Sequence, residues 1–558
     1  MQQVSIRRAM GGRRGIAFGV TVGLAFVLPV GAIWGATRAA ARDQLRALLG
    51  LPRVSFQLGL EFNHRHGWVF AGDALRAQAE LDRLRDEPGS PPGTPLQMLR
   101  FAELNDLAGN AAASRQAIQR AIGLFEETNA ADAEDDVLVA GYARALRLAG
   151  RSGESLSLLR RVQAANPEGW RSRLEMGLAL VSAAAGAVFP SGEIPLPAQP
   201  AEGGGAPPAV APSAAQVESM RGLLDQAEAE AEQAVQAGVS EAEARLGRAR
   251  IRTARRVLEA LLGEPGGDEK VRRVSRAMFS AESLPDLATA ARLAPDDPRV
   301  NAIWVWSVLL AETVARGGPA AGGLPAGVDW GSLPEDLRQV VRQVLARMDR
   351  AAQSEDPHLS SQALELAGSL QFMVIGDPGR AETGLREAVT RDPTNQPAWE
   401  VLCASLATAE RFESLMEVAR KRLKTADNAR NRFILAKAYD RLERRGEARM
   451  ELQQAWAKWP KDPLPALGLC ALVVRDDLES AGLGVAARLL GAVQENLGKN
   501  PSREMVQSLL LVRGVVLALA GRLDPARQSI EQLLSLDPED VTAREALRLL
   551  DRLASETG

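Results

Sequence analysis

The chain has 558 residues, of which 46% are hydrophobic, 25% are charged and two are tyrosine, and its formal net charge is −3. This balance fits an alanine- and leucine-rich helical protein better than a β-sandwich. It also gives no global attraction to nucleic acid. From about residue 55 onward no segment alternates convincingly with the period of a strand, so the sequence predicts an all-α protein.

The N-terminal segment is predicted to be a basic tail followed by a membrane-spanning helix. Residues 1–14 contain four arginines and no acid, and the run 15–36 is uncharged. A helix of about 22 residues spans roughly 33 Å, enough to cross the hydrocarbon core of a bilayer. Arginines at such a flank stay in the cytoplasm. We therefore expect a single-pass signal-anchor, with the rest of the chain on the periplasmic, extracytoplasmic side.

A cleaved signal peptide is the alternative interpretation of this segment. Pro29 and Gly31 could break the apolar helix, and Ala39 and Ala41 form a small-x-small cleavage pattern. The mature chain would then be secreted. The apolar run is longer than the roughly 7 to 15 residues of the apolar region within a signal peptide, which favours the uncleaved anchor.

Glycine recurs every four residues in the same run, at Gly15, Gly19 and Gly23. In a membrane helix this spacing lets two backbones approach and form a homodimer. Glycine is also common in membrane helices in general, so the spacing can be explained without a dimer.

The region after the anchor is predicted to begin with helical repeats over 54–187. Its first helical pair is expected at about 54–85. The stretch 188–213 is dominated by proline, glycine and alanine. Such a composition buries too little apolar surface to order itself, so we expect a flexible insertion there.

Three more regions follow in chain order. Irregular helical repeats are expected over 214–355, interrupted by short glycine- and proline-rich breaks. A regular block is expected over 362–540. The last stretch, 541–556, carries its leucines and alanines on one stripe and its arginines elsewhere, which is typical of a helix that caps a repeat array.

The regular block contains successive variants of one unit of about 34 residues, at 362–395, 396–428 and 429–462. In the third unit, large and small residues alternate at helical spacing: Leu435, Ala436, Tyr439, Ala448, Leu452, Ala455 and Pro460. This pattern resembles the tetratricopeptide repeat (TPR). The resemblance implies an α-solenoid in which antiparallel helix pairs stack and share one continuous core.

The resemblance also implies where a partner would bind. In this family the first helices of the pairs line a concave groove that receives a peptide or a helix of another protein, and the repeats themselves are not catalytic. Carried onto this chain, the groove positions give these candidate residues: Arg430, Phe433, Lys437, Asp440, Arg441, Arg144 and Arg147.

Cations around an apolar patch could clamp an acidic or C-terminal peptide. The same positions of 396–428 are nearly uncharged, so a uniformly basic groove is not expected. The chain also departs from the carboxylate-clamp members of the family, because it lacks their combination of lysine and asparagine. Its ligand therefore cannot be copied from them.

We predict no catalytic residue, no cofactor and no metal site. His64 and His66 lack a cysteine or carboxylate pair that would complete a zinc pattern, and His358 has no evident partner. Phosphate-loop, dinucleotide and hydrolase motifs are absent from the sequence. Cys403 and Cys470 are expected to be buried free thiols, too far apart for a disulfide.

One charge block has two interpretations. Acidic residues of 225–243 precede a run of arginines over 245–256. The arginines could form a basic stripe for an acidic ligand, but no aromatic residues are interleaved for stacking on bases. We favour two antiparallel helices that neutralise one another.

These observations predict a non-catalytic TPR scaffold or adaptor, tethered to the membrane and facing the extracytoplasmic side. Its concave groove would bind a partner protein, for example during assembly of an envelope complex. The alternative is a secreted or envelope-associated module that binds a glycan or another non-protein component through Trp304, Trp306 and Trp330. An enzyme would need a pocket lined by converging acids within 170–360.

Overall fold

The computed structural model describes residues 41–46, 48–49, 51, 60–63, 65–70, 72–86, 93–189, 212–262, 268–316, 330–476, 480–497, 503–538 and 540–555. They fall into two compact units. The small unit comprises Met1–Gly50, Val473–Gly484 and Leu510–Gly558, and the large unit comprises Leu51–Leu472 and Val485–Leu509. The predicted anchor 15–36, with its three spaced glycines, and most of the insertion 188–213 lie outside the described residues.

The predicted membrane location is corrected by the structure. Across the residues just given, no helix is both long enough and apolar enough to cross a bilayer. The longest helices carry charge along their length, as in the 24-residue α8 (Ala214–Ala237), which contains Glu218, Arg221 and Asp225. The predicted single-pass arrangement, with periplasmic repeats, is therefore wrong for the part of the chain that the structure describes.

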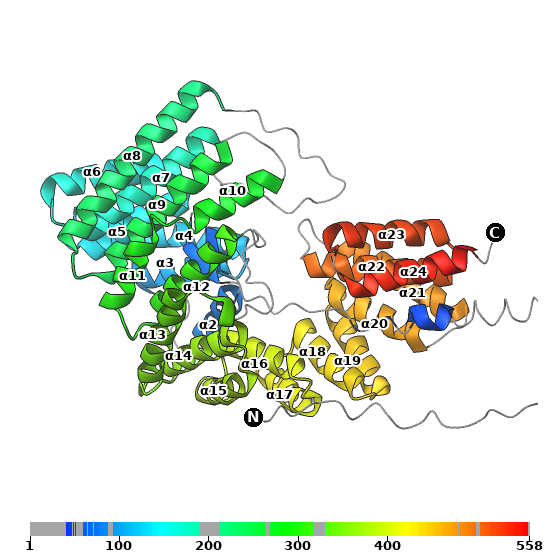
Figure 1. Cartoon of the computed structure of the whole chain (residues 1–558). Coiled ribbons are helices and arrows are strands. Elements are labelled where there is room, and N and C mark those ends of the chain that lie inside the picture. Colours follow the sequence, from blue (N-terminus) through cyan, green and yellow to red (C-terminus); the bar gives the residue numbers. More distant parts are fainter. Residues whose placement is uncertain are drawn as a thin grey trace, which may run out of the picture. The chain divides into compact units, whose positions relative to one another are not determined.

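The large unit is built mainly of helices joined by short turns (Figure 1). Its first half contains α2 (Asp73–Asp86), α3 (Pro95–Leu107), α4 (Ala111–Glu127), α5 (Asp136–Leu148), α6 (Ser152–Ala165), α7 (Trp170–Val188), α8, α9 (Ala242–Leu262), α10 (Asp268–Met278), α11 (Leu284–Leu293) and α12 (Pro298–Ala315), with a 3-10 turn at Ala130–Asp132.

The second half of the chain continues in the same way. It contains α13 (Glu335–Ala351), α14 (Pro357–Leu370), a π-helical turn (Gln371–Ile375), α15 (Pro378–Arg391), α16 (Gln396–Thr408), α17 (Phe412–Thr425), α18 (Ala429–Arg441), α19 (Arg445–Lys458), α20 (Pro463–Asp476), α21 (Ser480–Asn496), α22 (Arg503–Leu519), α23 (Leu523–Leu536) and α24 (Val541–Ser555). A 3-10 turn, Trp330–Ser332, precedes α13.

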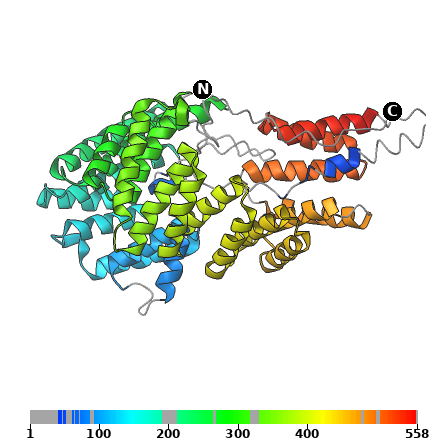
Figure 2. The same ribbon diagram turned by 60° about the horizontal axis from the view of Figure 1, so that its bottom comes forward.

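The stacking of helix pairs confirms the predicted TPR-like fold. Helices α14 to α19 form a series in which each packs against its sequence neighbour within the series, and α14 also contacts α16 (Figure 2). The second helices α15, α17 and α19 start at Pro378, Phe412 and Arg445, 34 and 33 residues apart. This is the period expected from the sequence.

Small residues let these helices approach, as the repeat pattern predicts. Gly468 of α20 faces α18 and α19, where an added Cβ would lie 2.8 Å from a ring carbon of Phe433 and 3.2 Å from Leu452. Ala448, Leu452 and Phe433 are fully buried. When the helices approach closely, more apolar surface is removed from water, and this burial stabilises the packing of each pair against the next.

The first predicted helical pair is partly wrong, because a β-hairpin precedes α2. Strands β1 (Leu60–Asn63) and β2 (Gly67–Phe70) pair antiparallel, with Leu60 opposite Phe70 and Phe62 opposite Trp68. Leu60, Phe62 and Trp68 are buried, and the rings of Phe62 and Trp68 meet edge to face at 5.5 Å. Gly67 has φ +81°, a conformation that glycine adopts without a steric penalty and that closes the turn.

Candidate functional site

A cavity of about 870 Å³ lies in the large unit. Its wall combines α2 with residues of α3, α5, α12, α14, α16 and α18. Its lining includes the charged residues Asp73, Arg76, Arg144, Arg299, Glu365 and Arg430. The cavity thus joins the beginning of the described large unit to first helices of the regular block.

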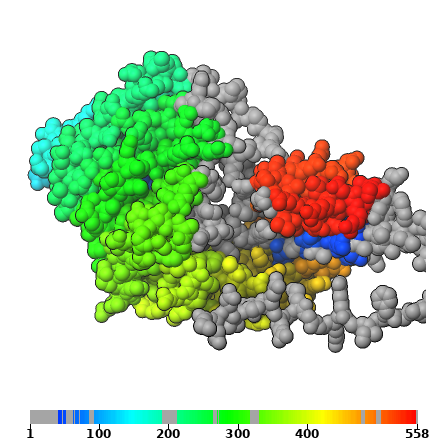
Figure 3. Space-filling view, in the orientation of Figure 1, coloured from blue at the N-terminus to red at the C-terminus, as the bar shows by residue number. Residues whose placement is uncertain are grey.

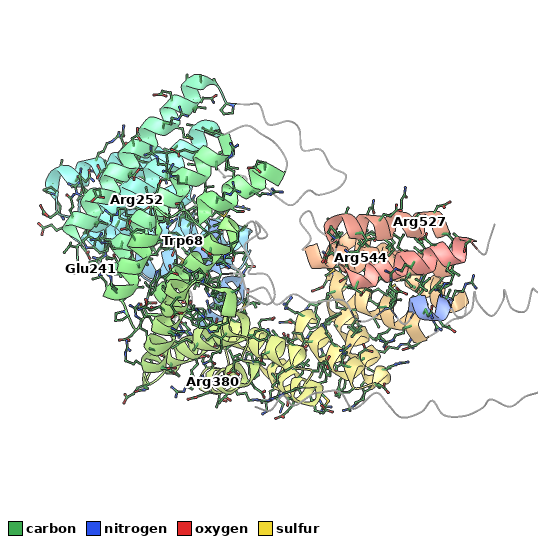
Figure 4. All side chains as sticks on the ribbon, viewed as in Figure 1. Trp68, Glu241, Arg252, Arg380, Arg527 and Arg544 are labelled. Atoms are coloured by element: carbon green, nitrogen blue, oxygen red, sulfur yellow. The ribbon has the colours of Figure 1, made fainter. Side chains whose placement is uncertain are left out.

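The β-hairpin and α2 are held at this cavity by contacts from distant helices. Arg250 of α9 donates a hydrogen bond to the carbonyl of Arg65. Arg299 of α12 donates to the carbonyl of Trp68 at 3.4 Å and to both carboxylate oxygens of Asp73, at 3.2 and 3.1 Å. Trp68 lies within the large unit, where Figure 4 labels it. These contacts make the segment 60–86 part of the cavity wall.

Arg76 ties α2 to α14. Its guanidinium donates to Asp73 at 3.0 Å and to Glu365 at 2.5 Å. Burial by itself lowers the pKa of Arg76, but the carboxylates of Glu365 and Asp73 outweigh it and raise that pKa above its ordinary value. The guanidinium therefore stays charged, and α2 is bound to a first helix of the stack by an ion pair.

Carboxylates lie behind their cationic partners around the cavity. Four pairs share this arrangement, in which the acid side chain is only 3–10% exposed and the arginine is 29–47% exposed. The pairs are Asp73 with Arg299, Glu103 with Arg144, Glu365 with Arg76, and Glu400 with Arg430, and the imidazole of His358 lies in the same way in front of Asp392. The more accessible member of each pair is thus the donor of hydrogen bonds.

Two further acids line the same cavity. Glu80 is paired with Arg100 at 3.1 Å, and the arginine is again the more exposed partner. Asp297 accepts hydrogen bonds from the backbone N–H groups of Arg299 and Val300 at the start of α12. All seven carboxylates in the wall therefore already accept hydrogen bonds or form ion pairs.

Glu400 on α16 is the most strongly perturbed acid of the site. It accepts from Arg422 at 2.6 Å and from Arg430 at 3.0 and 3.1 Å. Burial alone would raise its pKa, but the two guanidinium groups lower it to about 2. Glu400 is therefore a permanent anion at neutral pH, and it fixes Arg430 at the edge of the cavity.

The structure brings two of the seven sequence-predicted groove residues together. Arg144 and Arg430 both line the cavity, Arg144 at 2.6 Å from Glu103. Arg147 is instead buried in the stack, where it forms an ion pair with Glu175. Phe433 is fully buried against α20.

The other three candidates lie elsewhere on α18. Lys437 and Asp440 are partly buried, and Arg441 is exposed. The Arg441 guanidinium lies 4.9 Å from the ring of Phe412 and 3.7 Å from the carboxylate of Glu410. Their roles in binding stay predictions.

Glu400 shows what the sequence interpretation missed. Treating 396–428 as nearly uncharged gave this acid little weight, although it faces Arg430 of the next unit. Both lie at groove positions of neighbouring repeats, 30 residues apart. Comparing groove positions between successive units would have found the pair. By contrast, Asp73, Arg76 and Arg299 belong to no repeat register that could have brought them together.

Two of the histidines lie within hydrogen-bonding distance of aspartates. His66 Nε2 lies 2.7 Å from Asp106, and this hydrogen bond lowers the pKa of Asp106. His358 Nδ1 lies 2.9 Å from Asp392. His64 lies outside the described residues. Within the described part of the chain, no group of three or more histidine, cysteine or acidic side chains is placed to hold a metal ion.

Both cysteines are buried and free, as predicted. Burial raises the pKa of Cys403 to about 11 and that of Cys470 to about 12. At neutral pH both are therefore thiols rather than thiolates, which makes them poor nucleophiles.

The acidic and basic blocks of α8 and α9 neutralise one another, as favoured from the sequence. Arg252 contacts Glu228 at 3.2 Å, and Arg255 contacts Asp225 at 2.8 Å. Arg248 is held by Glu232 and by Asp286 of α11. These arginines are engaged within the protein and do not form an open basic stripe.

No protein-family model and no curated protein matches the chain. Solved structures that resemble it include yeast Tom70, with 12% identity and a TM-score of 0.36 over 83% of this chain and 89% of that one. A monomeric mutant of IFIT1 with m7Gppp-AAAA has 15% identity and a TM-score of 0.36, over 92% of each chain. A tetratricopeptide repeat protein from Parabacteroides merdae ATCC 43184 has 14% identity and a TM-score of 0.34, over 53% of this chain and 99% of that one. Since these scores are low, the fold rests on the helix pairs themselves.

Proposed function

We propose that this protein is a non-catalytic scaffold that binds an acidic segment of a partner protein in the cavity of the large unit. The observation that carries the proposal is the order of charges in the wall, where exposed cations stand in front of buried carboxylates. A carboxylate entering the cavity would meet guanidinium donors before it met another acid.

One helix of the protein itself, α2, already packs at this face. Helix α2 lies against α3 and α16 and is bound to α14 by the ion pair of Arg76 with Glu365. An incoming helix or extended peptide would use the same chemistry, with carboxylates accepting from Arg144, Arg299 and Arg430. Apolar contact is available beside them from Trp306 and Leu359, which also line the cavity.

Fixed arginines suit this role for an entropic reason. A free arginine side chain loses roughly 2 kcal/mol of rotamer entropy when it is immobilised. Arg430 is already held by Glu400, and Arg299 by Asp73, so less of this freedom remains to be lost when a ligand binds. The buried carboxylates therefore support binding without touching the ligand.

The test is a selection of peptides from a random library against the full-length protein, followed by affinity measurements on the selected peptides. We expect enrichment of aspartate and glutamate. Arg299→Ala should weaken binding about tenfold or more, as for the loss of a charge-assisted hydrogen bond. Arg380→Ala is the matched control, because this residue is 81% exposed on the second helix α15 at the edge of the large unit (Figure 4). Selection without acidic enrichment, or equal affinities of the two variants, would refute the proposal.

A glycan is the second candidate ligand, and one observation favours it. Trp306 lines the cavity, where its indole could stack on a sugar. Trp304 is instead buried with the guanidinium of Arg347 5.2 Å from its ring, and Trp330 lies 5.8 Å from that of Arg342. Binding on a glycan array that Trp306→Ala abolishes and Arg299→Ala leaves intact would replace the peptide by a glycan.

A further inference from the structure

The small unit binds a short helical segment from the opposite end of the chain. Residues 41–46 are helical, and Ala41, Leu45 and Leu49 are 0–2% exposed. Arg42 and Gln44, between the first two of these, are exposed. Ala41 and Leu45, four positions apart, lie on one face of this helix, and Leu49 is buried just after its end. This is the pattern by which an amphipathic helix enters a groove.

A single arginine fixes the orientation of this segment. Arg46 donates from Nε to the carbonyl of Val474 at 3.0 Å and from Nη2 to the carbonyl of Arg475 at 2.8 Å. Both carbonyls belong to the last turn of α20, where no intrahelical donor remains for them. A cation is also favoured there by the helix dipole. The contact therefore combines two charge-assisted hydrogen bonds with apolar burial.

The rest of the small unit has its own core. Helices α23 and α24 pack together and bury Ala526, Ile530 and Leu533 against residues such as Ala546 and Leu549. Residues 41–49 contact this unit from more than 420 positions away in the sequence, at Val474 of α20 and through a hydrogen bond of 3.4 Å from Arg552 of α24 to Gln44. Figure 3 shows residues 41–46, in blue, against the red helices of the small unit. The segment thus resembles a bound ligand more than one of the stacked helix pairs.

We propose that the small unit contains a second binding site, independent of the cavity in the large unit, for a short amphipathic helix of a partner protein. Residues 41–49 are its resident ligand, bound in cis. The recognised pattern has small or apolar residues at positions 1, 5 and 9 and an arginine at position 6. The arginine is required because the backbone carbonyls of Val474 and Arg475, at the carboxyl end of α20, accept its hydrogen bonds.

Exchange between the resident segment and a partner follows from ordinary competition. A ligand tethered to its own site acts at an effective concentration on the order of 1 mM. A partner helix with the same contacts would be outcompeted at micromolar concentrations, whereas a longer helix with additional contacts would replace the segment. A partner helix therefore has to bind this site more tightly than the resident segment in order to replace it.

The experiment uses the full chain with Leu45→Glu and Leu49→Glu, which removes two apolar anchors and vacates the site. The probe is a fluorescently labelled peptide of residues 41–50, followed by fluorescence anisotropy. We expect it to bind the variant at least about tenfold more tightly than the wild type, whose site is occupied. The same peptide with Arg46→Ala should bind about tenfold more weakly, whereas Arg42→Gln, at an exposed position, should change little.

Absence of binding to a folded variant, or equal binding to variant and wild type, would overturn the proposal. If the double substitution unfolds the small unit, the wild type is used instead. Unlabelled peptide is added in large excess, and hydrogen exchange of residues 41–49 is measured. Faster exchange supports displacement of a resident ligand, and unchanged exchange shows that the segment is a fixed part of the unit.

Discussion

Helices α16–α19 and helices α7–α9 both pack against their sequence neighbours, but the helices of the two regions differ in length. The first four have 13 or 14 residues each, and their pairs repeat at nearly constant spacing. Helices α7, α8 and α9 have 19, 24 and 21 residues. Both regions bury a continuous apolar face. A regular period in the sequence therefore indicates helices of equal length. The period is lost over 170–262 because the helices there are longer, although they still stack.

The two regions also differ in where they place buried charge. In the regular block Glu400 is held by Arg422, which is buried, and by Arg430, which reaches the cavity. In the long-helix region Asp286 of α11 accepts from Arg248 and Arg252 of α9. The first cluster holds Arg430 in the cavity wall, whereas the second joins helices of unequal length.

The largest expected effect comes from breaking the second cluster with Asp286→Ala. This change removes the buried partner of Arg248 and leaves it only Glu232, which is 46% exposed, and the loss of one partner of a buried pair costs about 3–5 kcal/mol. We expect the free energy of local opening of α9 and α11, measured by hydrogen exchange, to fall by this amount. Glu282→Ala is the control, since its pair with Arg256 is exposed and should contribute well under about 1 kcal/mol. Similar losses in both variants would show that burial does not distinguish the two pairs.

Glu400→Gln tests the first cluster and should cost about 3 kcal/mol at pH 7. The folded-state pKa of Glu400, about 2, is below its ordinary value of 4.5, so its ionisation stabilises the fold above pH 4.5. That contribution is lost as the pH falls from 4.5 towards 2. The difference in melting temperature between wild type and variant should therefore be large at pH 7 and shrink steadily below pH 4.5. A difference that is independent of pH would contradict the assigned pKa.

Glycines at close helix contacts should tolerate an added methyl group poorly in both regions. Gly468→Ala places a Cβ 2.8 Å from Phe433, and Gly177→Ala places one 2.7 Å from Ile251 and 3.0 Å from the backbone carbonyl of Ala227. Overpacking of this kind costs about 1–3 kcal/mol. Thermal unfolding should show the loss in both variants. A loss confined to Gly468→Ala would mean that the long helices are packed more loosely than the regular pairs.

Gly222→Ala should give the smallest effect, with the opposite sign. Gly222 lies inside α8, and nothing lies within 4 Å of the position that its Cβ would take. Alanine in an open helix interior is favoured over glycine by about 0.5–1 kcal/mol. A small rise in melting temperature is expected. A fall would show that α8 contacts something at this face.

The proposed binding surface was only partly accessible to sequence reasoning. Arg144 and Arg430 were found because they occupy groove positions of recognisable repeats, and the structure places both in the cavity wall. Their buried partners Glu103 and Glu400 escaped because a sequence does not show which acids are covered by neighbouring helices. The role of segment 60–86 also escaped, since it matches no repeat and forms a hairpin where helices were expected.

The sequence by itself determined the helical repeat, because the alternation of large and small residues acts over three or four positions and is local. It also determined that Cys403 and Cys470 are buried thiols, since both lie at small-residue positions of the repeat. Only the tertiary structure decided what lines the cavity, because Arg76 and Glu365 are separated by 289 positions. It likewise decided that Arg46 meets the end of α20, a contact that depends on backbone carbonyls rather than on any residue type.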